Sequence, residues 1–453
     1  MKKVIKSRVF LVIITTIVVA SVSIYATNVY NATDVFYNTS DGSTKSVSVV
    51  LNELYDKMNT GGCATDVAIP TLGTGMIPVT ISDNGTVKYA DTNDMWYNYC
   101  DKKWANAVIL SSGSYRVGDI IPESSIQSYF VWIPRFRYKL WNTGTASKTA
   151  HSIEIEFETK DTTPSTGSNN GEWLTHPAFT SFNSNGFWVG KFETGYNGAT
   201  SADSAKVNSS DSTKVIIKPN VYSWRNITIG NMFLTSYNYK RDLDSHMMKN
   251  TEWGAVAYLS HSKFGIDGEV NINNNSSYKT GYSALPSTNQ QTYPGTSGDG
   301  SSYNSTYNTE IGYLASTTGN ITGVYDMSGG AHEFVAGYIS GKTGSSGLTP
   351  TNYDSKYFDV YNTSSSNTSY QYRILGDATG EMTPIKSYKD GDGTSRHHSI
   401  WYSGGSDFVD SSLSWFDRGG MYTEGGNASQ FYFGRNNGAA ARFSSFRIVL
   451  TPQ

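Results

Sequence analysis

Residues 128–142, SYFVWIPRFRYKLWN, constrain the fold more than any other stretch of the sequence. Apolar and basic side chains alternate there, which is the pattern of a β-strand with one apolar and one basic face. The apolar set is Phe136, Tyr138 and Leu140, and the basic set is Arg135, Arg137 and Lys139. The basic set predicts a solvated sheet face, with an anion site as the alternative. Pro134 places this strand, or its start, at a sheet edge or bulge, because proline cannot donate to the ladder.

Other segments carry comparable signals. GFWVGKFETGYNG (186–198) predicts a second aromatic-rich strand, and NTEWGAVAYLSHSKFG (250–265) is the best helix candidate. Phe446, Ile448 and Leu450 fall on one side of a terminal strand. Ser, Thr, Asn and Gly dominate residues 143–172 and 268–322, so we expect a loop in the first range and a surface insertion in the second.

The N-terminus has the order of an export segment. Four basic residues precede the largely apolar run 9–25, and the chain then becomes polar. Residues 1–27 therefore predict a signal peptide or a membrane anchor, and a buried core helix is the disfavoured alternative. Either form of export leaves the rest of the chain extracellular or at the cell surface.

Residues 28–62 predict a linker with a short amphipathic helix at 47–58, and residues 63–116 predict a β-rich segment. The apolar face of that helix suits either homo-oligomerisation through a stalk or packing onto the following domain. The cysteines of the chain are Cys63 and Cys100, and an even pair outside the cell predicts a disulfide before a metal site or a nucleophile.

The overall charge argues against one class of partner. A formal net charge of −3 and a pI near 6.2 leave no broad basic field for a phosphate backbone. We therefore expect no nucleic acid partner.

A His-Glu pair stands in GVYDMSGGAHEFVAGY (323–338), behind a Gly-Gly turn. A zinc protease needs a second histidine one helical turn after the first, and that position is Ala336. The zinc interpretation therefore fails.

Six motifs in this order resemble the sulfatase-modifying-factor (formylglycine-generating enzyme) family, which has a variant of the C-type lectin fold. They are YFVWIPRFRYKL, GFWVGKFETGYNG, NTEWGAVAYL, GVYDMSGGAHEF, RGG (418–420) and FRIVL (446–450). The resemblance implies an α+β, C-type-lectin-like domain with long irregular loops over residues 117–453, after the apolar export helix and the short amphipathic helix.

The resemblance also implies a structural calcium ion, held by backbone carbonyls of Gly329 and Ala331 and by the Glu333 carboxylate. The alternative is that Glu333 caps or pairs locally. Two departures from the family pattern lie here, Gly330 in place of Asn and Phe334 in place of Trp. The copper-dependent oxidases of the family need a C-terminal cysteine pair, and no cysteine follows Cys100, so we expect no redox metal and no catalysis.

The same motifs are similar to variable proteins of diversity-generating retroelements, in which the segment between the last two motifs displays a ligand-binding face. This segment lies within residues 418–445, and its side chains suit adaptable recognition. The predicted ligand-binding residues are Tyr422, Glu424, Asn427, Gln430, Tyr432, Arg435, Asn436 and Asn437. We expect non-catalytic binding of a protein or glycan there; the alternatives are a formylglycine-generating oxidase and a structural surface or stalk subunit.

Overall fold

The computed structural model describes residues 36–38, 44–49, 67–140, 151–167, 171–284, 305–362, 385–389, 395–399, 405 and 407–452. The chain divides into two units, Met1–Ala64 and Thr65–Gln453. In the first unit, β1 (Phe36–Asn38) pairs antiparallel with β2 (Thr44–Ser46), and Val47, Ser48 and Val49 are helical. The rest of the predicted 47–58 helix and the whole of the predicted 1–27 export segment lie outside the described residues.

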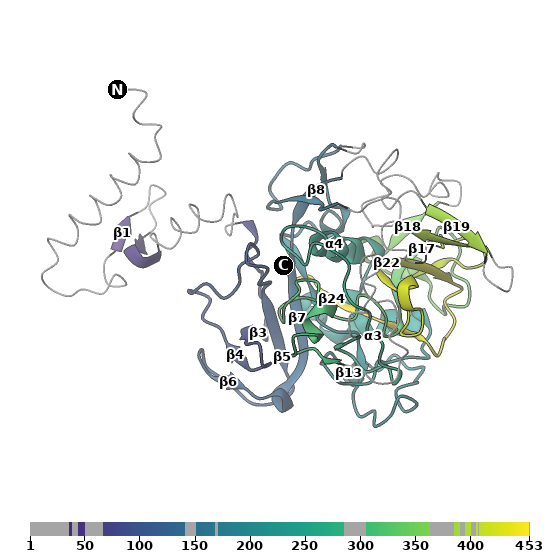
Figure 1. Cartoon of the computed structure of the whole chain (residues 1–453), viewed down its shortest axis with the longest axis horizontal. Coiled ribbons are helices and arrows are strands. Elements are labelled where there is room, and N and C mark those ends of the chain that lie inside the picture. The colour runs from purple at the N-terminus through teal and green to yellow at the C-terminus, as the bar shows by residue number, and fades with distance from the viewer. Residues whose placement is uncertain are drawn as a thin grey trace, which may run out of the picture. The chain divides into compact units, whose positions relative to one another are not determined.

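The second unit is built on a large antiparallel sheet (Figure 1). Its eight strands run in the order β14-β24-β11-β7-β5-β3-β4-β6. They are β3 (Met76–Ile81), β4 (Val87–Tyr89), β5 (Asn106–Leu110), β6 (Ile120–Ile121), β7 (Ile126–Pro134), β11 (Gly186–Gly190), β14 (His246–Met247) and β24 (Ile448–Leu450). The C-terminal strand thus lies between two segments distant in sequence, with Trp188 opposite Leu450 and His246 opposite Val449.

A second sheet of five strands carries the region predicted to bind ligand. Its path is β18-β17-β21-β22, and β23 pairs in parallel with the start of β17. The strands are β17 (His332–Ile339), β18 (Asp359–Tyr361), β21 (Trp415–Gly419), β22 (Ser429–Asn436) and β23 (Ser444–Phe446).

The remaining strands form small sheets. Three of them pair in the order β10-β8-β9, namely β8 (Phe136–Lys139), β9 (Glu154–Phe157) and β10 (Leu174–Thr175). The others are the pairs β12 (Gly195–Tyr196) with β13 (Val215–Ile216), β15 (Tyr282–Ser283) with β16 (Ser305–Thr306), and β19 (Ile385–Lys389) with β20 (Ser395–Ser399).

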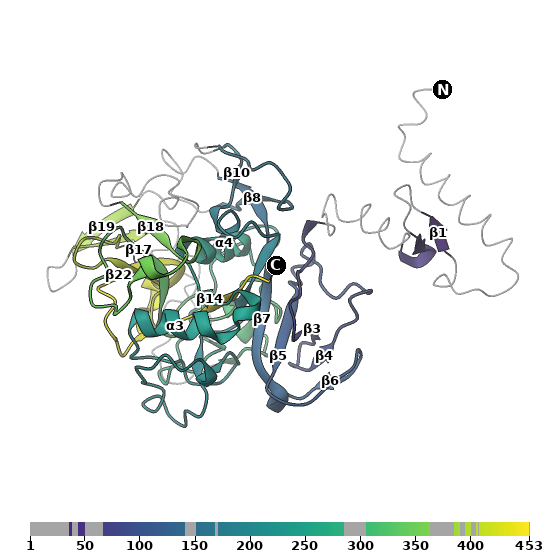
Figure 2. The same cartoon turned by 180° about the vertical axis from the view of Figure 1, so that it is seen from behind.

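Two α-helices complete the described part of the second unit, α3 (Ile229–Tyr239) and α4 (Asn250–Ser260). Every residue of α4 is buried, since the helix packs on β7 of the large sheet and on β17 and β22 of the second sheet (Figure 2). The amide of Lys249 donates to Glu252 Oε2 over 2.8 Å and so caps the start of α4.

The prediction of an α+β class is wrong, because the described residues are β-rich with few helices. Short strands formed in Ser-, Asn- and Tyr-rich segments that offered no clear periodicity, such as β15 and β16. The predicted surface insertion is also wrong in part, since residues 269–275 are buried. Their polar side chains find partners inside the protein, as when Asn271 donates to the Ala284 carbonyl over 3.1 Å.

The strand predicted over residues 128–142 breaks at Arg135 into β7 and β8, which belong to different sheets. Pro134 is the last residue of β7, although β7 lies inside the sheet and not at its edge. Arg137 and Lys139 are partly exposed and pair with glutamates of β9, as a solvated face requires. Arg135 contradicts the prediction, because it is buried and its Nε lies 3.1 Å from Glu158 Oε1.

Candidate functional site

The hairpin β21–β22 carries the predicted ligand-binding segment on a buried frame. Arg418 of β21 is fully buried, donates to Asn250 Oδ1 of α4 over 2.9 Å and stacks near the Trp253 ring. Gly419 and Gly420 have φ of +80° and +72°, a backbone region that favours glycine. They turn the chain into residues 420–428, which we call the display loop. The frame therefore fixes where this loop leaves the sheet.

The eight predicted ligand residues do not share one environment. Tyr422, Glu424, Asn427, Tyr432, Arg435, Asn436 and Asn437 are half-buried. Gln430 is wholly buried, and its Nε2 donates to the Gly268 carbonyl over 2.8 Å. Gln430 therefore faces the interior and not a ligand.

Two of the predicted residues shape a turn. The side-chain oxygens of Asn436 and Asn437 accept from the amides of Gly438 and Ala439, at 3.3 and 3.0 Å. Asparagine commonly stabilises turns in this way. The two residues thus have a local structural role at the end of β22.

Tyr422 lies at one side of the display loop. Its ring meets the Tyr278 ring edge to face, with centroids 4.9 Å apart, and the Arg225 guanidinium stacks 3.7 Å over the Tyr278 centroid. Tyr278 has a φ of +55°, an unusual backbone conformation for a bulky residue. The sequence analysis missed Tyr278 and Arg225, which come from segments far from the hairpin.

Glu424 reaches into a second group of polar side chains at the other side of the loop. His332 Nε2 lies 3.3 Å from Glu424 Oε1, and His332 Nδ1 lies 3.7 Å from Asp417 Oδ1. The Tyr432 ring covers the imidazole, with centroids 5.5 Å apart. We call His332, Asp417, Glu424 and Tyr432 the acidic cluster.

Sequence reasoning found Glu424 and Tyr432 but not His332 and Asp417. His332 was considered as a zinc ligand and rejected, and Asp417 carried no signal. The register brings them together, because Phe334 of β17 lies opposite Asp417 and His332 shares the face of Phe334. Asp417 also lies opposite Gly434, two residues beyond Tyr432 on β22.

The protonation equilibria of the acidic cluster are shifted. Burial raises the pKa of Asp417 to about 6, although the neighbouring His332 acts in the opposite direction. Burial by itself would lower the pKa of His332, but the hydrogen bond with Glu424 and the charge of Asp417 outweigh it, so this pKa is raised. Asp417 therefore loses its proton at a higher pH than an ordinary aspartate, and His332 keeps its proton to a higher pH than an ordinary histidine.

Arg435 pairs with Asp410 at the far end of β22. Both side chains are partly exposed, so water screens their attraction. Arg435 thus remains available to a ligand at little cost.

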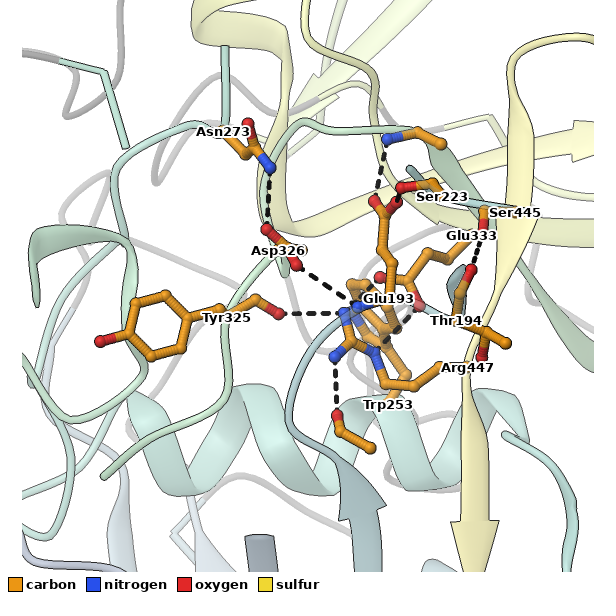
Figure 3. Close-up of polar contacts among 12 residues, drawn as sticks. Glu193, Thr194, Ser223, Trp253, Asn273, Tyr325, Asp326, Glu333, Ser445 and Arg447 are labelled. Carbon is orange, nitrogen blue, oxygen red and sulfur yellow. Dashed lines mark hydrogen bonds and ion pairs between the residues drawn. The ribbon is translucent and has the colours of Figure 1, made fainter. Parts of the chain in front are cut away.

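Glu333, one of the predicted calcium ligands, lies in a buried ionic cluster (Figure 3). Arg447 Nε donates to Glu333 Oε2 over 2.9 Å, and Arg447 Nη2 pairs with Glu333 Oε1. The Ala331 amide donates to Glu193 Oε1 over 2.8 Å, and the Gly329 amide donates to the Gly419 carbonyl over 3.1 Å. Both Glu333 oxygens thus have a cationic partner, which favours the alternative that Glu333 pairs locally.

Two further carboxyl groups approach Glu333 in this cluster. The Glu193 amide donates to Asp326 Oδ2 over 3.3 Å, and Ser223 Oγ donates to Glu193 Oε2 (Figure 3). Burial raises the pKa of Glu193 well above its usual range, and Glu333 and Asp326 raise it further. Burial also raises the pKa of Glu333 to about 7, against the lowering effect of Arg447. Arg447 thus does not fully compensate the three carboxyl groups.

Three other predictions concern features that the structure describes only in part. The described residues contain no group of three or more His, Cys, Asp or Glu side chains placed to hold a metal ion. Cys100 is disulfide-bonded, and Cys63 lies outside the described residues, so their pairing stays a prediction. None of the helices in the described ranges is both long and apolar enough to cross a membrane, and residues 9–25 fall outside those ranges.

Fold and site together define a β-rich protein that presents a polar and aromatic loop on a buried frame. No protein-family model matches the sequence, and neither does any curated protein. Among solved structures, the chain is similar to Treponema denticola variable protein 1, at 10% sequence identity over 83% of this chain and 95% of that chain, with a TM-score of 0.19. A TM-score this low does not establish a common fold. The resemblance to the sulfatase-modifying-factor family finds no support in these comparisons.

Proposed function

We propose that this chain is a non-catalytic binding protein that holds a ligand against the display loop and the adjoining face of β22. The observation that carries the proposal is the contrast within the hairpin. Tyr422, Glu424 and Tyr432 stay half-exposed, while Arg418 and Gln430 beneath them are fully buried. A rigid frame under amphipathic side chains lowers the entropy lost on binding.

The chemistry of these side chains supports recognition of another macromolecule. Tyrosine offers an apolar ring with a polar tip, and Glu424 and Arg435 offer charges of both signs. The export segment and the cysteine pair of the sequence support placing this surface outside the cell, where a protein or glycan is the available ligand.

A display experiment tests the proposal. The purified full-length chain is panned against a random peptide library and applied to a glycan array, and the affinity of each captured ligand is then measured for Tyr432→Ala. We expect a loss of about tenfold or more, the size typical of a truncated aromatic anchor. Thermal melting confirms that the variant is folded.

Tyr115→Ala is the matched control, because Tyr115 is half-buried and its hydroxyl bonds Ser125 at the large sheet. It should leave the affinities unchanged. Ligands that bind Tyr432→Ala and Glu424→Ala as tightly as the original chain would place the binding surface elsewhere.

A further inference from the structure

The acidic cluster contains hydrogen-bonding capacity that its neighbours in the described structure leave unused. Asp417 is 5% exposed, and its Oδ1 accepts no hydrogen bond within the described part of the chain. The same holds there for Glu424 Oε2 and His332 Nδ1. A buried carboxylate oxygen without a donor is costly, so such a site calls for a donor from outside the protein.

The charges around Asp417 favour a cationic donor. Two other carboxylates lie near Asp417. Glu424 belongs to the display loop, and Asp407 is held beside β22 because its amide donates to the Phe433 carbonyl. Both carboxylates raise the pKa of Asp417, although less than its burial does. His332 is the basic group in direct contact with Asp417 and Glu424 among the described residues. Arg418 follows Asp417 in β21 and so projects from the other face, toward α4.

Two glycines make room for the carboxylates. A Cβ at Gly434 would collide with Asp417 Oδ1 and would lie 2.8 Å from the Tyr432 hydroxyl. A Cβ at Gly420 would lie 2.7 Å from Glu424 Oε2. The backbone of the hairpin therefore accommodates both unused oxygens, and it brings the Tyr432 hydroxyl close to one of them.

We propose that the acidic cluster is the subsite that takes a basic side chain, lysine or arginine, of a protein ligand. This inference rests on the proposed function and adds the chemistry of the ligand. An ammonium or guanidinium group offers several N–H donors to the two carboxylates, and it gains from contact with the Tyr432 ring. A glycan without amino groups lacks such a charge.

The unused oxygens are covered in this structure, so the entering group has to move a side chain. Glu424 stands on the display loop with 21% of its side chain exposed, and Tyr432 is half-buried. Rotation of either side chain opens a route without a change in the sheet. The ligand cation then replaces His332 as the partner of the carboxylates.

The subsite should respond to pH in one direction. Asp417, with its raised pKa, is neutral in acid, and His332 carries a competing positive charge there. Both changes weaken the binding of a cation as the pH falls. Affinity should therefore rise as the pH passes through about 6, where Asp417 loses its proton, and it should rise further as His332 loses its proton at higher pH.

The test uses the full-length chain and three small probes. N-acetyl-arginine amide and N-acetyl-lysine amide carry the cation, and N-acetyl-citrulline amide is the neutral analogue of the arginine probe. Binding is followed by the NMR signals of the His332 ring. We expect both cationic probes to bind with millimolar affinity. The citrulline probe should bind at least about tenfold more weakly, because it cannot form a charge-assisted hydrogen bond.

Three variants locate the effect. Asp417→Asn and Glu424→Gln should each weaken the binding of the cationic probes about tenfold or more. Glu424→Gln serves even if Asp417→Asn folds poorly, because Glu424 lies in the display loop and is less buried than Asp417. Asp83→Asn is the matched control, since Asp83 is exposed in the turn between β3 and β4 of the eight-stranded sheet. It removes the same charge and should have no effect.

The outcomes separate this inference from the proposed function. Equal binding of the arginine and citrulline probes, no binding of either cationic probe, or no effect of both Asp417→Asn and Glu424→Gln would each overturn the inference and leave ordered water as the partner of the oxygens. If peptide-library ligands then lack basic residues but still require Tyr432, the proposed function stands without this subsite. If no ligand requires Tyr432, both fail.

Discussion

Arg447 is the residue that holds the buried ionic cluster together. Its guanidinium donates to Glu333, to the Gly190 carbonyl over 2.8 Å and to the Tyr325 carbonyl over 3.0 Å, and it is fully buried. Removing it would leave buried carboxyl groups without their cation. The penalty for such an uncompensated charge exceeds the net value of the pair itself.

Arg447→Met should therefore lower the free energy of unfolding by about 3–5 kcal/mol. Arg137→Met is the control, because Arg137 and its partner Glu156 are both partly exposed, and it should cost about 1 kcal/mol or less. Urea unfolding measures both. A loss below about 1 kcal/mol for Arg447→Met would show that the buried cluster tolerates the missing cation.

The burial of individual charged residues was not predictable from the alternating pattern. Arg135, Arg137 and Lys139 alternate regularly in the sequence, yet Arg135 is buried against Glu158 while the other two are partly exposed. The difference arises because the chain crosses from β7 to β8 at Arg135 and changes sheet. Periodicity describes one strand and cannot foresee this crossing.

Among the elements, β17 and the turn before it connect the acidic cluster with the buried ionic cluster around Arg447. His332 belongs to the acidic cluster, whereas the next residue, Glu333, pairs with Arg447 in the buried ionic cluster. Successive residues of a strand point to opposite faces, so one strand serves both clusters. Gly330 fits this turn because a Cβ there would collide with Glu193 Oε1, which explains the glycine at a position where the resembled family has Asn.

The contacts of this turn lead us to expect no stabilisation by calcium. A calcium ion at Glu333 would have to share the carboxylate with Arg447, whose positive charge repels it. Thermal melting of the full-length chain with added calcium and with excess chelator should give the same Tm. A higher Tm in calcium would instead support the predicted ion, because a ligand that binds the folded state raises its apparent stability.

For the whole molecule, buried carboxyl groups tie stability to pH. Glu269 is a clear case, since burial raises its pKa to about 7 while it accepts from Ser429 Oγ and from the amides of Val270 and Gln430. Its usual pKa is 4.5. Between these values the folded protein keeps a proton that the unfolded chain has lost, so raising the pH destabilises the fold.

Glu269→Gln should remove this dependence. The stability of the variant relative to the original chain should increase as the pH rises from about 4.5 to 7, by roughly 3 kcal/mol at most. Chemical unfolding across that range measures it. Glu154→Gln is the control, because it removes an exposed carboxylate of β9. If the difference in unfolding free energy between Glu269→Gln and the original chain stays constant with pH, the proposed linkage is wrong.

The candidate site was predictable in part. The resemblance to variable proteins, supported by the composition of the segment, pointed to residues 418–445, and Glu424 and Tyr432 lie in the acidic cluster there. Gln430 was misplaced because the register shift between Arg418 and Gly419 and the burial of residues 269–275 turn it inward. Asp417 and His332 could not be found, since their proximity depends on pairing between strands far apart in the chain.

By itself, the sequence determined where several elements form. The segments predicted as strands became β7, β8, β11 and β24, and residues 250–260 became α4, because side-chain periodicity acts within a few residues. Only the tertiary structure decided the β-rich class, the burial of Arg135 and Gln430, and the meeting of His332 with Asp417 and Glu424. These features depend on the register between distant strands and on the need to pair each buried charge. No short segment of the sequence contains that information.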